Sequence, residues 1–97
     1  MTLSQVYCDK REAQLKEWKA RLDQLRAKAD RATAEAKIEM YRELHDLQSR
    51  YESVREQFSR AKDSSDEAWD EVKSGFEDAW SELKHSFEQA AARIKAK

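Results

Sequence analysis

The chain contains no proline and only one glycine, Gly75, in 97 residues. A β-rich fold of this length needs several tight turns, and tight turns draw heavily on glycine and proline. The composition is instead rich in Ala, Glu, Lys, Leu and Arg, which is typical of long helices and coiled coils. Regularly spaced aromatic side chains argue against a disordered chain. The sequence therefore predicts one all-α domain over residues 1–97.

The first predicted helix covers about residues 4–61, because apolar side chains recur every three or four residues along it. Two successive steps of four, from Ala36 to Met40 and Leu44, form a stutter, which unwinds a supercoil locally without ending the helix. No glycine or proline marks a corner before Ala61. The residues expected to pack along this helix are Leu15, Trp18, Leu22, Leu25, Leu44, Leu47, Tyr51, Val54 and Phe58.

A second helix is predicted at about residues 67–96, after a hinge at 62–66 in the sequence KDSSDEA. Serine and aspartate favour turns and helix N-caps, and the following acidic residues suit the positive end of a helix dipole. This helix repeats its pattern every 11 residues, so that Trp69 recurs as Trp80 and Phe76 as Phe87. Such a repeat keeps matching side chains on one face. The residues expected to pack on that face are Trp69, Val72, Phe76, Trp80, Leu83, Phe87 and Ile94.

The two helices differ in length, about 87 Å against about 43 Å at 1.5 Å per residue. A folded-back second helix would leave Trp18, Leu22 and Leu25 without a partner inside the chain. We therefore expect an antiparallel helical hairpin whose long helix pairs with a second copy, giving a homo-oligomer, most simply a dimer. The alternative is a monomeric three-helix bundle, in which the long helix folds again near residues 29–33.

The charge of the chain is nearly balanced, with a net charge of −1. Residues 1–61 carry about +2 and residues 62–97 about −3, too mild a separation for a nucleic-acid partner. No apolar run approaches a membrane span, and the first ten residues do not resemble a signal peptide. A single cysteine, Cys8, cannot form an internal disulfide. We expect a cytoplasmic protein.

Catalytic and metal-binding patterns give no support for an enzyme. The sequence ELKH, Glu82 to His85, has the Glu-x-x-His spacing of di-metal bundles, but both side chains should point to solvent. Cys8 fits a small, half-buried position one heptad before Leu15. The sequence predicts no enzyme, cofactor or metal site.

Three segments resemble a family of small bacterial coiled-coil proteins described as stress-response proteins: MTLSQVYCDKREAQLKEW, AEAKIEMY, and DEAWDEVKSGFEDAWSELKHSFEQAAARIK. The resemblance implies a stress-induced protein of the bacterial cytoplasm without catalytic residues. We therefore expect a non-enzymatic helical interaction or structural protein that self-associates and docks other proteins. The alternative is peripheral binding to a membrane surface through the amphipathic repeat of the second helix.

Overall fold

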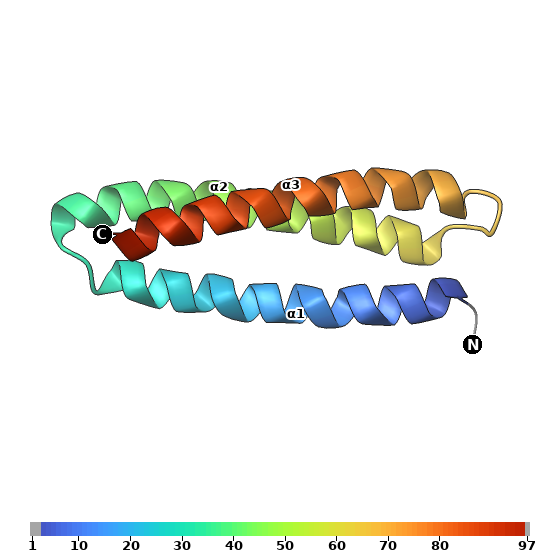
Figure 1. The fold of residues 1–97 in the computed structure, drawn as a ribbon, viewed down its shortest axis with the longest axis horizontal. Coiled ribbons are helices and arrows are strands. Elements are labelled where there is room, and N and C mark those ends of the chain that lie inside the picture. Colours follow the sequence, from blue (N-terminus) through green and yellow to red (C-terminus); the bar gives the residue numbers. More distant parts are fainter. Residues whose placement is uncertain (1–2, 97) are drawn as a thin grey trace.

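Three antiparallel helices lie side by side in the computed structural model, which describes residues 3–96 and the side chains of residues 5–94 (Figure 1). They are α1 (Leu3–Asp30), α2 (Ala34–Asp63) and α3 (Trp69–Ala96). The bundle measures 51 × 20 × 17 Å, so the helices run along its full length. The prediction of an all-α fold is confirmed, and of the two predicted arrangements the three-helix bundle fits.

The long helix expected over residues 4–61 is in fact two helices, separated by a corner at residues 31–33. The side-chain oxygen of Thr33 accepts a hydrogen bond from the backbone N–H of Ala36 at 3.4 Å and caps α2. Across the corner, the hydroxyl of Tyr41 donates a hydrogen bond to the carboxylate of Asp30. No residue between 3 and 96 has a positive φ, so the corner needs no glycine. The expectation of a continuous helix was wrong because it required glycine or proline at a turn.

Burial of the inner face of α1 explains why the chain folds back at this corner. Cys8, Leu15, Leu22 and Ala29 follow one another every seven residues, and each is at most 8% exposed. In an isolated extended helix these side chains would face water. Full burial of each leucine contributes about 1.5–3 kcal/mol. A backbone hydrogen bond lost where the helix breaks at an exposed position costs less, because water replaces it.

The same packing covers, within one chain, the residues that were expected to lie between two chains. Leu22 is buried, and Trp18 and Leu25 are half-buried against the core of the same chain. Their prediction as intermolecular contacts assumed that α3 was too short to reach them. The corner brings α1 alongside both other helices, so the chain covers this stripe itself.

The rest of the core lies between α2 and α3. On α2 the buried residues alternate steps of four and three: Met40, Leu44, Leu47, Tyr51, Val54, Phe58 and Ala61. On α3 they are Phe76, Trp80, Leu83, Phe87, Ala90 and Ile94, whereas Val72 and Trp69 are half-buried. The step at Ala36–Met40–Leu44 is therefore the place where a new helix begins its own heptad phase, not a stutter inside a longer helix.

The connection between α2 and α3 matches its sequence. The hydroxyl of Ser64 donates a hydrogen bond to the carbonyl of Ala61 at 2.7 Å, at the end of α2. The hydroxyl of Ser65 accepts one from the N–H of Ala68 at 3.3 Å, just before α3 begins at Trp69. These bonds supply partners for backbone groups that a helix end leaves free.

Candidate functional site: the junction between α1 and α3

Long polar and aromatic side chains bridge α1 and α3, and we call this region the α1–α3 junction. It consists of Tyr7, Arg11 and Trp18 from α1, and Glu77, Trp80 and Phe87 from α3. Each of these residues uses a long side chain to reach across the groove between the two helices. The junction is therefore built differently from the α2–α3 seam, which is filled by fully buried apolar residues such as Phe76 and Leu83.

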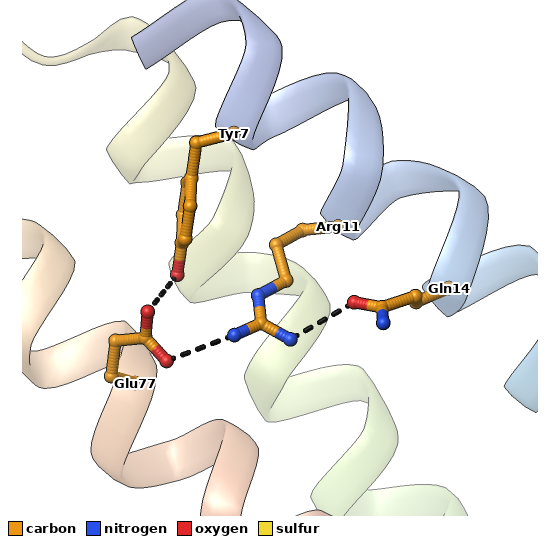
Figure 2. Close-up of polar contacts among 4 residues, drawn as sticks. All are labelled: Tyr7, Arg11, Gln14 and Glu77. Carbon is orange, nitrogen blue, oxygen red and sulfur yellow. Dashed lines mark hydrogen bonds and ion pairs between the residues drawn. The ribbon is translucent and has the colours of Figure 1, made fainter. Parts of the chain in front are cut away.

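The polar half of the junction is centred on Arg11, as Figure 2 shows. Arg11 occupies a core-facing position of α1 between Cys8 and Leu15. One terminal nitrogen of its guanidinium lies 3.1 Å from a carboxylate oxygen of Glu77, and the other donates to the side-chain oxygen of Gln14 at 2.9 Å. The remaining side-chain nitrogen, Nε, is buried and has no hydrogen-bond partner within the described chain. The second carboxylate oxygen of Glu77 accepts a hydrogen bond from the hydroxyl of Tyr7 at 2.5 Å.

Arg11 also stacks on aromatic rings. Its guanidinium carbon lies 4.4 Å from the ring centre of Trp80 and 5.3 Å from that of Tyr7. A cation over a partly desolvated ring contributes about 1–2 kcal/mol. The ion pair itself contributes little, since the Glu77 side chain is 38% exposed and water screens it. The polar half of the junction therefore fixes the register of α1 on α3 more than it stabilises the fold.

The aromatic half of the junction is a stack that begins with Trp18. Its ring lies 4.3 Å from the ring of Trp80, with an interplanar angle of 20°, and 6.0 Å from the ring of Phe87. Arg21 also reaches this stack, because its guanidinium carbon lies 6.0 Å from the ring centre of Phe87. Because Trp18 remains half-buried, the stack forms an edge of the core that water still reaches.

The surroundings of Tyr7 determine its protonation state. Burial, followed by the hydrogen bond to Glu77, raises the pKa of Tyr7 from its usual 10.0 to about 12. The tyrosine is therefore neutral at physiological pH and acts as a hydrogen-bond donor. Except for Nε of Arg11, the described donors and acceptors of this cluster are directed toward one another, so the chemistry of the junction is recognition between two helices.

A hollow of about 470 Å³ lies beside the junction, where α1 meets the connection between α2 and α3. Cys8, Asp9, Lys62 and Trp69 line part of it. Burial raises the pKa of the Cys8 thiol, whereas the charge of Lys62 acts in the opposite direction. A raised thiol pKa disfavours the nucleophilic thiolate, which agrees with a packing role for Cys8.

The other candidates from the sequence lie apart from this junction. Glu82 and His85 are both exposed on α3, and no group of three metal-ligand side chains occurs among the residues that the structure describes. Sequence reasoning missed Tyr7, Arg11 and Glu77. The sequence signal for Arg11 was its position, because it stands four residues before Leu15 and on the same face of the helix as Cys8.

Comparison with known proteins gives no further constraint. A scan against protein-family models, a search of curated proteins and a search of solved structures each returned no match. Within the described residues, none of the helices combines the length and the apolar character needed to cross a membrane. The resemblance to bacterial stress-response proteins stays a prediction.

Proposed function

We propose that this protein is a non-catalytic helical interaction protein that self-associates, and that its binding surface is the face of the α2–α3 hairpin on which α1 lies. The observation that carries the proposal is the construction of the α1–α3 junction. It joins the helices through long aromatic and polar side chains, most of them half-buried, such as Trp18 stacked on the buried Trp80.

The unequal packing of the three helices supports this proposal. The most deeply buried large side chains, Phe76, Leu47, Leu83, Ile94 and Val54, all belong to α2 and α3. On α1, the core positions include the small residues Cys8 and Ala29. Local opening has its lowest free energy where few apolar contacts must be broken. Release of α1 is therefore the easiest opening of the bundle, and it uncovers a face shaped to accept a helix.

The resemblance of the sequence to bacterial stress-response proteins supports a cytoplasmic, stress-induced role for such association. Docking of another protein would use the same face, because an amphipathic helix in an apolar groove is a recurring mode of recognition. The hairpin face presents the aromatic rings of Trp80 and Phe87 to any helix that replaces α1.

Light scattering on a sizing column, over a wide dilution series, tests self-association. We expect a mass that rises from one chain of 11.4 kDa toward two chains as the concentration increases. Ala20→Glu is a control for substitutions on α1. Because Ala20 is exposed, its substitution should leave the dimer unchanged. A single-chain mass at every concentration would contradict the proposal.

A second candidate is binding to a lipid surface, and the aromatic residues of α3 favour it. Release of α1 would expose Trp80 and Phe87 together on one face of the hairpin. Because residues 62–97 carry a net charge of about −3, uncharged headgroups suit this helix better than anionic ones. Phosphatidylcholine vesicles with brominated acyl chains should then quench tryptophan emission. Unchanged emission throughout the titration would remove this candidate.

A further inference from the structure

The corner between α1 and α2 indicates how the proposed self-association takes place. We infer that two copies of the chain exchange their α1 helices: in each copy α1 and α2 straighten into one helix across residues 31–33, and α1 docks on the α2–α3 hairpin of the other copy. This inference rests on the proposed self-association, and it names the second copy of this chain as the occupant of the hairpin face.

Part of the corner keeps helix-like hydrogen bonds. The N–H of Arg31 donates to the carbonyl of Lys28 at 3.2 Å, and the N–H of Ala32 donates to that of Ala29 at 3.1 Å, so helix-like hydrogen bonds continue past the end of α1. At Thr33 the φ of −64° is that of an α-helix, and the ψ of 159° is extended. Straightening therefore needs at least a change of ψ at Thr33.

The sequence of the corner also suits a helix. Residues 29–36 read ADRATAEA, with no glycine or proline and with four alanines. Alanine and arginine are among the best helix formers. The side-chain cap shown at the start of α2 is the long, exposed bond from the N–H of Ala36 to Thr33. A continuous helix would give backbone partners to groups that the corner leaves to water. Short connections between well-packed elements are the usual hinges of such exchanges.

The antiparallel order of the helices makes the exchange geometrically simple. In the single chain, the end of α1 lies beside the start of α2, and α1 runs back along it (Figure 1). Once straightened, residues 3–63 would form one helix of about 90 Å, compared with a bundle of 51 Å. Two such chains, related by a twofold axis at residues 31–33, place each α1 on the other hairpin in the same direction as before. The contacts that α1 makes away from the corner are then remade between the copies.

The α1–α3 junction is completed by the partner in this arrangement. Tyr7 and Arg11 come from one copy and Glu77 from the other, in the geometry that Figure 2 shows within one chain. The guanidinium–carboxylate pair supplies charge complementarity at one place along the groove. It therefore sets the register in which a second copy docks.

Proline at position 34 tests the straightening step. Ala34 is the exposed first residue of α2, where proline is tolerated, and the preceding Thr33 already has the extended ψ that proline prefers. In a continuous helix the same ring would clash with the carbonyl of Asp30. We expect Ala34→Pro to remain a folded bundle and to lose the dimer at every concentration, whereas the control Ala34→Ser keeps it. Thr33→Ala should tighten the dimer on the order of tenfold. The substitution removes the cap from each single-chain bundle, whereas the straightened helices of the dimer have no cap there to lose.

A mixing experiment tests the exchange of α1 itself. Arg11→Glu and Glu77→Arg each place like charges in the junction when a chain meets itself or an identical copy. In an exchanged dimer of the two variants, both junctions pair opposite charges. We expect the variants, unfolded together in urea and refolded, to form heterodimers in excess over the statistical ratio in native mass spectrometry.

The outcomes separate the two proposals. Statistical mixing of the charge variants, or a dimer that persists in Ala34→Pro, would overturn the exchange of α1 and leave self-association standing. A wild-type chain that stays a single copy at every concentration would overturn both. Loss of the dimer in Ala34→Pro together with preferred heterodimers supports the exchange.

Discussion

Replacement of Trp18 by alanine is the sharpest test of how α1 is held in the bundle. The substitution removes the ring that stacks 4.3 Å from Trp80 and 6.0 Å from Phe87. It leaves the buried residues of α2 and α3 in place. If Trp18 instead lay on an extended helix in water, the same substitution would remove almost no contact. The size of the effect therefore distinguishes the folded-back helix from the long one.

The expected loss of stability follows from the burial of the ring. Truncation of a fully buried tryptophan costs about 3–5 kcal/mol. Trp18 is half-buried, and its stacking adds about 0.5–1.5 kcal/mol beyond burial. We therefore expect Trp18→Ala to lower the free energy of unfolding by about 2–3 kcal/mol. For a domain of this size, that loss corresponds to a fall in Tm of about 10–20 °C.

Urea unfolding followed by far-ultraviolet circular dichroism, at a concentration low enough to keep one chain per particle, measures this loss. Ala20→Ser on the exposed side of α1 is the control and should stay within about 0.5 kcal/mol. Combination with Trp80→Ala should give a coupling energy of about 0.5–1.5 kcal/mol. A loss within the range of the control would refute the stacked, folded-back position of Trp18.

Three further predictions concern other parts of the bundle. Wild-type stability should fall as pH rises from about 10 to about 12, because the raised pKa of Tyr7 favours its neutral form in the folded chain. The urea midpoint should fall less steeply with pH in Tyr7→Phe. An equal fall in both proteins would contradict Tyr7 as the origin of the pH dependence. Gly75→Ala should raise stability by about 0.5–1 kcal/mol, since an added Cβ meets no described atom within 4 Å; a lower thermal midpoint would show that this position is not open helix surface. Leu83→Ala should cost about 2–5 kcal/mol in urea unfolding, because Leu83 is 1% exposed; a cost below about 1 kcal/mol would place it outside the core.

Much of the local structure of this chain could be predicted from the sequence. The spacing of Phe76, Trp80 and Leu83 is a property of neighbouring turns of one helix, so it identifies the inner face of α3 without knowledge of its partner. The end of α2 could be placed as well, because Ser64 and Ser65 satisfy backbone groups within three residues of themselves.

The candidate site was much less predictable. Arg11 and Glu77 are 66 residues apart in sequence, and nothing in the periodicity of either helix indicates that they meet. An arginine at a core-facing position is a sign that a partner is required, since a buried charge without one is costly. The sequence leaves open which of the 20 acidic residues that partner is.

The sequence by itself determined that this protein is helical, where its apolar stripes lie and where α2 gives way to α3, because these depend on residues within a few positions of one another. Only the tertiary structure decided that α1 folds back at residues 31–33. Around Thr33 no glycine or proline marks a corner, and a threonine can either cap a helix or lie within one, so the choice falls to distant contacts. In the single chain those contacts are the burial of Leu15 and Leu22 and the stack of Trp18 on Trp80.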